Sequence, residues 1–250
     1  MSPERRSVKV GSLFMGGDWP VSIQTMWKSP LPLLETGAEP ALGSLVAEIR
    51  RLESIGCQLL RFAVPDETQA RALGILSGLS PLPLVADIHF DWRLALLCMD
   101  YPIAKIRINP GNIGARWKVR EVAAKAREHG IALRIGVNSG SLPEDLRDAE
   151  DIAQACVTAA EREIGYFEEL GFSDIVVSMK LNDPAEVERA NRIFAARYPH
   201  PLHLGVTEAG PLISGVVHNT AAIVPLLKDH IGATLRVSLS DSMEAEVLAA

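Results

Sequence analysis

Four polar residues in two short apolar segments are the strongest chemical signal in this sequence. In VADIHFD, Asp87 and His89 lie two positions apart, and in RINPGN the residues Arg107 and Asn109 have the same spacing. A spacing of two places both side chains of a pair on one face of a β-strand. Burying Asp, His, Arg and Asn there costs free energy unless a ligand or a polar network binds them. The pattern therefore predicts a polar site at the ends of two neighbouring strands.

Similar polar residues recur at the ends of other predicted strands, and five of them are cations. Arginine binds phosphate oxygens in a bidentate manner, so cations from five strands predict an anion site. Any single arginine has the alternative of a structural ion pair. Asp87 and Glu208 are the two carboxylates at these positions, however, and two cannot neutralise five cations. A compact substrate with more than one phosphate group and with hydroxyls fits this set. The cations are Arg61, Arg107, Arg134, Lys180 and Arg236. The other inward or strand-end candidates are Gln24, Asp87, His89, Asn109, Asn138, Ser178, Thr207, Glu208 and Ser238.

Eight strand-like segments alternate with segments of helical periodicity along the chain. Eight such units in 250 residues predict a closed (β/α)8 TIM barrel, in which the carboxyl ends of all strands meet at one end. An open doubly wound sheet is the alternative, but the glycine-rich phosphate loop that it predicts after the first strand is lacking. The predicted strands are 21–26, 59–64, 87–89, 107–109, 133–138, 174–180, 202–208 and 234–240. The predicted helices are 42–55, 66–76, 91–99, 115–128, 143–170 with a break near its start, 184–197, 214–229 and one beginning at Asp241.

The remainder of the chain indicates one domain over residues 1–250 with no change in composition. Residues 8–19 are expected to form an entry segment with a turn at Gly16 and Gly17, and 27–40 a long irregular connection. A net charge of −6 disfavours general nucleic-acid binding. No apolar run approaches the roughly 18 residues that span a bilayer, and no signal peptide is evident, so a cytoplasmic location is expected.

A protein-held metal site is not predicted. Asp87 and His89 at one strand end are typical of part of a barrel metallohydrolase site, but such a site needs several converging ligands. The other histidines fall at helix ends, within a helix or toward the start of a strand. Cys57, Cys98 and Cys156 are widely separated and form no Cys-x-x-Cys pair, so we expect them to be buried as small apolar residues.

Six motifs at the predicted strand ends are specific in their order and spacing. They are VADIHFD (85–91), RINPGNIG (107–114), RIGVNSGSL (134–142), SMK (178–180), HLGVTEAG (203–210) and LRVSL (235–239). Together they resemble the 4-hydroxy-3-methylbut-2-enyl diphosphate synthase family, the iron–sulfur enzymes of the non-mevalonate isoprenoid pathway. The resemblance extends from about Val8 to the last residue.

The resemblance implies a substrate, a reaction and a role for each site residue. The substrate is 2-C-methyl-D-erythritol 2,4-cyclodiphosphate. The reaction is a two-electron reductive ring opening with loss of a hydroxyl, supplied with electrons by flavodoxin or ferredoxin. Glu208 is the implied proton donor near the leaving C–O bond, Ser178 lies in one of the motifs, and a homodimer is possible. The implied ligands of the diphosphate are Arg61, His89, Arg107, Arg134, Lys180, Arg236 and Ser238. The implied ligands of the ring and hydroxyls are Asp87, Asn109, Asn138 and Thr207.

This sequence departs from the family pattern in two places. The segment MWKSPLPLLETG after the first strand differs from the polar segment usual there. The family also carries a C-terminal domain in which three cysteines and a glutamate bind a [4Fe–4S] cluster, and that domain is absent here. The chain ends at EVLAA, one or two turns into its last predicted helix, which suggests a truncated chain or an incomplete gene product. We therefore expect substrate binding without reduction.

Three alternatives remain open at this stage. The first is a non-catalytic phospholigand-binding barrel with a regulatory role. The second is a transferase similar to dihydropteroate synthase, against which the RINPGN and TEAG motifs argue. The third is a split enzyme in which a separate chain supplies the iron–sulfur domain.

Overall fold

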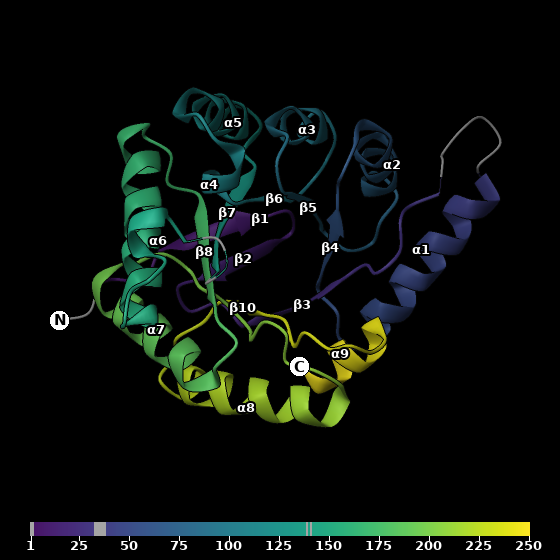
Figure 1. The fold of residues 1–250 in the computed structure, drawn as a ribbon. Coiled ribbons are helices and arrows are strands. Elements are labelled where there is room, and N and C mark those ends of the chain that lie inside the picture. Colours follow the sequence, from purple (N-terminus) through teal and green to yellow (C-terminus); the bar gives the residue numbers. More distant parts are fainter. Residues whose placement is uncertain (1–2, 33–38, 139, 141) are drawn as a thin grey trace.

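Eight parallel strands form a nearly closed barrel in the computed structural model, which describes residues 3–32, 39–138, 140 and 142–250 (Figure 1). The strand order is β8-β7-β6-β5-β4-β3-β10-β9, and a parallel bridge between Val177 and Leu202 joins its two ends. The predicted TIM barrel is confirmed. The strands are β3 (Ser22–Met26), β4 (Leu59–Ala63), β5 (Leu84–Ile88), β6 (Lys105–Ile108), β7 (Ala132–Asn138), β8 (Ile175–Lys180), β9 (His203–Leu204) and β10 (Thr234–Leu235).

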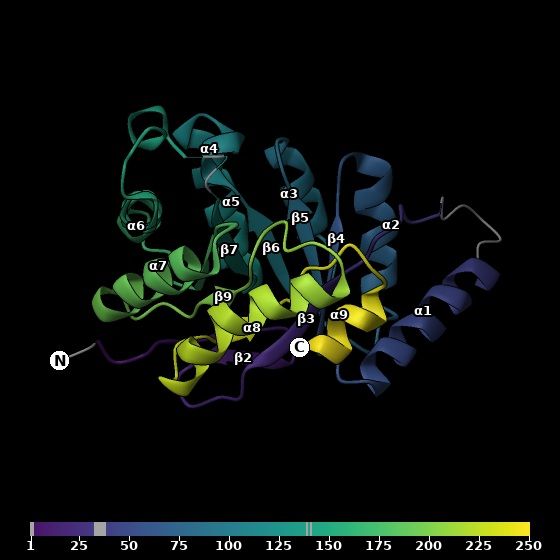
Figure 2. The same cartoon turned by 60° about the horizontal axis from the view of Figure 1, so that its bottom comes forward.

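The helices surround the barrel on its outside (Figures 1 and 2). Asp66 caps α2 by accepting from the amide of Gln69, as its sequence position predicts. The last helix begins differently from the prediction, because the hydroxyl of Ser242, and not Asp241, accepts from the amide of Ala245. The larger helices are α1 (Glu39–Ser54), α2 (Glu67–Ser77), α3 (Trp92–Cys98), α5 (Arg116–His129), α6 (Ile152–Glu169), α7 (Pro184–Arg197), α8 (Leu212–Lys228) and α9 (Met243–Ala249). The shorter ones are α4 (Pro110–Ile113) and η2 (Glu144–Leu146). None of the helices within the described ranges is long and apolar enough to cross a membrane.

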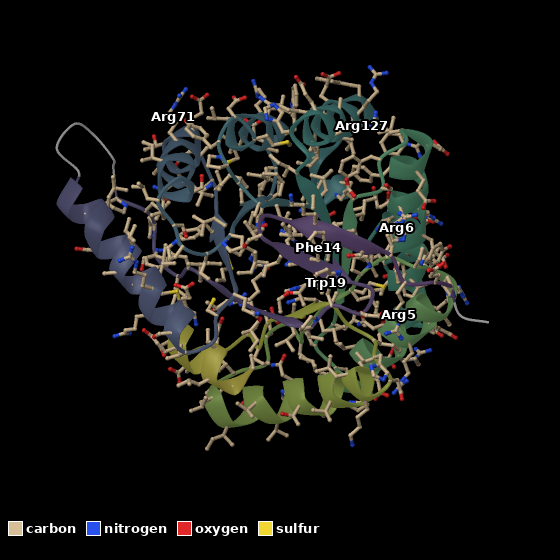
Figure 3. The ribbon with its side chains drawn as sticks, turned by 180° about the vertical axis from the view of Figure 1, so that it is seen from behind. Arg5, Arg6, Phe14, Trp19, Arg71 and Arg127 are labelled. Atoms are coloured by element: carbon tan, nitrogen blue, oxygen red, sulfur yellow. The ribbon has the colours of Figure 1, made fainter. Side chains whose placement is uncertain are left out.

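A β-hairpin closes the amino-terminal end of the barrel, within the predicted entry segment. It consists of β1 (Ser7–Val10) and β2 (Leu13–Gly16), which pair antiparallel. Its apolar side chains pack against the barrel's interior residues Leu59 and Val85. Figure 3 shows this hairpin lying across the barrel. The hairpin was not predicted because each strand has only four residues, too few to show a clear alternation in sequence.

The last two strands, β9 and β10, are shorter than predicted. Residues 33–38 of the predicted connection 27–40 lie outside the described part of the chain. The ladder after β9 is interrupted because the amide of Val206 donates to the side chain of Asn219 on α8. The amide of Thr207 then donates to the carbonyl of Leu181. A side-chain acceptor thus replaces the neighbouring strand at this point.

His200 near the bottom of the barrel gives the first testable prediction, which concerns acid stability. Its side chain is buried, Nε2 lies 3.1 Å from Nη1 of Arg6, and Nδ1 has no partner among the described residues. Burial, with a smaller contribution from Arg6, lowers the pKa of His200 to about 4. Because an unfolded histidine has a pKa of about 6.5, lowering the pH from about 6.5 to about 4 protonates only the unfolded chain. The stability that the neutral ring contributes is therefore lost in this range.

We expect His200→Gln to reduce this loss of unfolding free energy by up to about 3 kcal/mol. Urea denaturation at a series of pH values measures it. The exposed His129 on α5 provides the control, His129→Gln. An equal loss of unfolding free energy in the two variants between about pH 6.5 and about pH 4 would contradict the role assigned to His200.

Candidate functional site

The polar pairs of β5 and β6 meet in one buried ion-pair network at the carboxyl end of the barrel. Nη1 of Arg107 lies 2.9 Å from Oδ1 of Asp87, and Nε of Arg61 lies 3.5 Å from its Oδ2. Nε2 of His89 lies 3.3 Å from the same Oδ2, although His89 is itself exposed. The register makes Asp87 the lateral neighbour of Arg107, and Arg107 that of Arg134. Three adjacent strands thus present charges at one level of the barrel.

Asp87 remains a carboxylate in this network. Burial alone would raise the pKa of its side chain, which is only 2% exposed. The charge of Arg61, the hydrogen bond from His89 and the charge of Arg107 act in the opposite direction and hold the pKa of Asp87 well below its ordinary value. The fixed negative charge compensates part of the surrounding positive charge and leaves the remainder for a ligand.

Arg134 is a buried cation that forms no ion pair with a described residue. The residue is 2% exposed, and its Nε and Nη1 atoms have no hydrogen-bond partner among the described residues. Burial and the charges of Arg61 and Arg107 lower its pKa, but a guanidinium remains protonated in proteins. Lys180 on β8 is also buried, and burial together with the charge of Arg134 lowers its pKa. Buried cations without counter-charges are costly, which favours an anionic ligand here.

Two glycines leave room for these cations. A Cβ atom on Gly136 would lie 3.0 Å from Nε of Arg107, and one on Gly205 would lie 2.8 Å from Nζ of Lys180. Because the Arg107 guanidinium is held by Asp87, it has little freedom to move away from a new methyl group.

We therefore expect Gly136→Ala to lower the free energy of unfolding by about 1–3 kcal/mol. Gly140→Ala is the matched control, since a Cβ there would meet nothing within 4 Å. Thermal unfolding of both variants measures the difference. Equal midpoint temperatures of unfolding in the two variants would show that Arg107 is free to move away from the added methyl group.

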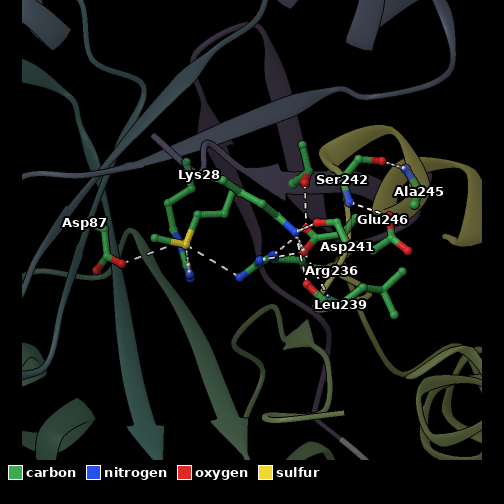
Figure 4. A network of polar contacts seen from close by, with 11 residues as sticks. Lys28, Asp87, Arg236, Leu239, Asp241, Ser242, Ala245 and Glu246 are labelled. Atoms are coloured by element: carbon green, nitrogen blue, oxygen red, sulfur yellow. Dashed lines mark hydrogen bonds and ion pairs between the residues drawn. The ribbon is translucent and has the colours of Figure 1, made fainter. Parts of the chain in front are cut away.

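Arg236 is bound by a carboxylate that sequence reasoning did not find. Its Nε and Nη2 atoms donate to the two oxygens of Glu246 on α9, each at 2.9 Å. The expectation that Asp87 and Glu208 are the carboxylates available to the five cations is therefore wrong. Glu246 was missed because sequence order does not show that α9 packs beside β3. Figure 4 shows its contacts.

We call the carboxyl end of the barrel, around Asp87, Arg107 and Arg134, the mouth. Glu208 lies at the rim of the mouth and is exposed. Its Oε2 accepts from Nδ2 of Asn182 at 3.1 Å, and the hydroxyl of Thr207 donates to Oδ1 of the same asparagine at 2.7 Å. The backbone of Glu208 has φ of 53°, a conformation that costs a non-glycine residue about 1 kcal/mol. Asn182 was not predicted, and it holds the two predicted residues together.

The remaining predicted residues lie at or below the mouth with individual contacts. Oδ1 of Asn109 accepts from the amide of Gly111 and so caps α4. The hydroxyl of Ser178 is buried and donates to the carbonyl of Ile135 at 3.4 Å. Asn138 and Ser238 are half-buried. The structure therefore brings the predicted side chains to one end of the barrel and shows that some of them already have structural partners.

A second polar layer beneath the mouth was also largely missed. Lys105 on β6 is fully buried two residues before Arg107, and its Nζ lies 3.6 Å from Sδ of Met15 in the hairpin. Burial and the charge of Arg134 lower the pKa of Lys105. Gln24 and His203 are buried beside this layer, and their side-chain nitrogens have no partner in the described part of the chain. The period-two pattern of β6 already contained the signal for Lys105.

The cysteines of this chain do not fit an iron–sulfur cluster. Cys57, Cys98 and Cys156 are buried as free thiols in separate parts of the fold, and burial raises the pKa of each. A cysteine binds a cluster as the thiolate, which a raised pKa disfavours. Within the described ranges, no group of three or more His, Cys, Asp or Glu side chains is arranged to hold a metal ion.

The fold and the converging basic side chains define this chain as a TIM barrel with a cation-lined mouth. The chain belongs to the GcpE TIM-barrel domain family, which matches residues 5–250. It is 52% identical to 4-hydroxy-3-methylbut-2-en-1-yl diphosphate synthase (flavodoxin) of Treponema pallidum, with 96% of this chain and 61% of the relative covered. It is 48% identical to the protein of the same name from Treponema denticola, covering 96% and 66%. The resemblance inferred from the six motifs is confirmed, and the chain spans about two thirds of the length of these relatives.

Solved structures with similar folds are far more distant in sequence. Dihydropteroate synthase from Xanthomonas albilineans in complex with 7,8-dihydropteroate has a TM-score of 0.64 at 14% identity, over 98% of this chain and 96% of that one. Type I 3-dehydroquinate dehydratase from Clostridium difficile has a TM-score of 0.62 at 13% identity, over 95% and 90%. These similarities establish the barrel fold alone.

Proposed function

We propose that this chain is the substrate-binding barrel of a 4-hydroxy-3-methylbut-2-en-1-yl diphosphate synthase. The observation that carries the proposal is the uncompensated positive charge at the mouth, above all the buried Arg134. A cyclic diphosphate supplies the missing negative charge. It is also compact, so that one molecule contacts side chains from several strands at once. The relatives at 42–52% identity are named as synthases of a diphosphate, which supports a diphosphate ligand for this site.

The proposed roles follow the location of each side chain. We assign the diphosphate to Arg61, Arg107, Arg134, Lys180 and Arg236, with His89 and Ser238 at the edge. Asp87, Asn109, Asn138, Ser178 and Thr207 are assigned to the positioning of these cations and of the substrate hydroxyls. Glu208 is the proposed proton donor for the oxygen that leaves in the two-electron ring opening, because it is an exposed carboxylate at the rim.

The wider setting of the reaction belongs to the same proposal. Residues 1–250 form one substrate-binding domain. The [4Fe–4S] cluster of the family would be held by ligands other than the three cysteines of this chain and would supply the electrons. Flavodoxin is the proposed donor, since the relatives carry it in their names. A homodimer is the proposed assembly and the cytoplasm the proposed location. The relatives' names do not favour a regulatory barrel or a pterin-dependent transferase.

Calorimetric titration tests the substrate assignment. We expect 2-C-methyl-D-erythritol 2,4-cyclodiphosphate to bind with one molecule per chain and with an affinity that decreases as salt increases. Inorganic pyrophosphate is expected to bind more weakly, and 7,8-dihydropteroate not at all. Binding of dihydropteroate without binding of the cyclodiphosphate would refute the proposal in favour of the transferase.

A turnover assay tests the division of roles. Purified chain supplied with iron, sulfide and a chemical reductant is expected to bind the cyclodiphosphate without converting it. Mass spectrometry of the incubated substrate detects conversion. Full turnover by this chain alone would contradict the assignment of the cluster to other ligands.

A further inference from the structure

Glu246 on α9 binds two basic side chains at one side of the mouth. Its carboxylate accepts two hydrogen bonds from Arg236, and its Oε1 lies 3.0 Å from Nζ of Lys28 (Figure 4). The hydroxyl of Thr25 donates to Oε2 at 2.6 Å, and the amide of Leu239 donates to Oε1 at 3.1 Å. Glu246 is 1% exposed, whereas the side chain of Lys28 is 33% exposed. Glu246 therefore fixes side chains from β3, from the segment after β3 and from the segment after β10.

The ionisation of Glu246 is secured by these partners. Burial alone would raise its pKa, but the hydrogen bonds and charge of Arg236, and the hydrogen bonds from Thr25 and Leu239, lower its pKa below the ordinary value. A carboxylate in this position therefore keeps its negative charge and its hold on the guanidinium.

The geometry leaves one edge of the Arg236 guanidinium directed toward the mouth. Nε and Nη2 face Glu246, whereas Nη1 lies 3.6 Å from Sδ of Met26. The same sulfur lies 2.7 Å from Nη2 of Arg61, which in turn is paired with Asp87. Arg236 thus lies beside the central network, and Glu246 binds it from the side away from that network.

Lys28 maintains the positive charge of this group. The charges of Lys28 (+1), Arg236 (+1) and Glu246 (−1) sum to +1, whereas Arg236 and Glu246 alone would be neutral. The ammonium of Lys28 donates to the carbonyls of Leu239 and Asp241, which holds it in place. Lys28 and Arg236 also line one cavity of about 360 Å³ together with Met26 and Ala63.

We propose that Glu246 is a positioning residue of the diphosphate site, which orients Arg236 toward the ligand, and that Lys28 is a further affinity-determining cation of that site. This inference rests on the proposed function. An arginine that is already immobilised loses less side-chain entropy when a ligand binds, so the ligand binds more tightly. Lys28 lies in the segment that differs from the usual family pattern, which gives this segment a role in anion binding.

Replacement of Glu246 distinguishes positioning from simple electrostatics by the sign of the effect. Removing a negative charge near an anion site would by itself strengthen anion binding. If Glu246 acts by orienting Arg236, Glu246→Gln weakens cyclodiphosphate binding instead, by about tenfold. Glu244→Gln on the same helix is the control, because Glu244 pairs with the exposed Arg51 on α1. Calorimetry measures the affinities, and thermal unfolding confirms that each variant is folded.

A double-mutant cycle tests whether Glu246 acts through Arg236. In an Arg236→Met background, Glu246→Gln is expected to cause no further loss of affinity. An equal loss in both backgrounds would overturn the proposal, as would unchanged or tighter binding by the single variant. If the wild-type chain does not bind the cyclodiphosphate at all, the proposed function itself fails.

Lys28 offers a second test that leaves the Glu246 carboxylate in place. Lys28→Met is expected to weaken cyclodiphosphate binding about fivefold at low salt, and less at about 0.5 M salt. Lys228→Met removes an equal charge from the exposed end of α8 and is the control. Equal affinities of the two lysine variants would overturn the role of Lys28, even if Glu246→Gln should fail to fold.

Discussion

Replacement of Arg134 by methionine is expected to weaken ligand binding about 100-fold and, at the same time, to stabilise the ligand-free barrel. The guanidinium is 2% exposed with two unpartnered nitrogens, and Arg61 and Arg107 lie close enough to lower its pKa. Exchanging buried charges for apolar side chains stabilises some proteins by about 1–4 kcal/mol, and we expect a gain of this order.

The loss of affinity should be large, because the ligand supplies the missing partners of Arg134. Two charge-assisted hydrogen bonds contribute about 3 kcal/mol, which corresponds to about 100-fold in dissociation constant. Thermal unfolding of the ligand-free protein and calorimetry with the cyclodiphosphate measure the two effects. Arg120→Met, on the exposed face of α5, should change neither. A destabilised Arg134→Met barrel that still binds would refute this account of the mouth.

Asp87→Asn is expected to have the opposite effect on stability. The substitution keeps the shape of the side chain but leaves Arg61 and Arg107 without their shared counter-charge. Loss of one partner from a buried ion pair costs about 3–5 kcal/mol. Inorganic pyrophosphate at 100 times its dissociation constant should restore about 2.7 kcal/mol, because it binds the folded state. Thermal unfolding with and without pyrophosphate measures both effects.

The matched control for this variant is Asp100→Asn. Asp100 pairs with Lys125 at the surface, and we expect its loss to cost less than about 1 kcal/mol. Because the pKa of Asp87 is lowered in the folded state, its stabilisation is complete above its ordinary pKa of about 3.9 and is lost as the pH falls below that value. Asp87 therefore loses its stabilising effect at a lower pH than His200 does. If the Asp87→Asn variant is as stable as the wild type and pyrophosphate does not stabilise it further, Asp87 is not the counter-charge that Arg61 and Arg107 require.

The polar positions of the strands could be predicted because a period of two is visible in sequence. Asp87 with His89 and Arg107 with Asn109 each share one face of a strand, and the TIM-barrel rule then places both faces at one mouth. Lys105 has the same periodicity as Arg107, but a lysine at the beginning of a strand does not show that it is fully buried.

The contacts that could not be predicted join segments far apart in the chain. Glu246 meets Arg236 and Thr25 only after the barrel closes and α9 packs beside β3. Lys28 lies in a segment with no helical or strand periodicity, so nothing local indicates its partners. The β1–β2 hairpin was missed for a related reason, since its apolar residues have a defined environment only inside the barrel. Each of these features depends on contacts between distant segments of the chain, and local secondary-structure propensity does not encode such contacts.

A crystal structure of the chain with bound 2-C-methyl-D-erythritol 2,4-cyclodiphosphate is the most direct test of the central claim. The account predicts diphosphate oxygens within hydrogen-bonding distance of the guanidinium of Arg134, with Lys180 and Arg236 as further ligands and Glu246 still bound to Arg236. Diphosphate bound elsewhere, for example in the small cavity lined by Arg5, Arg6 and His230 at the opposite end of the barrel, with an empty mouth, would contradict it.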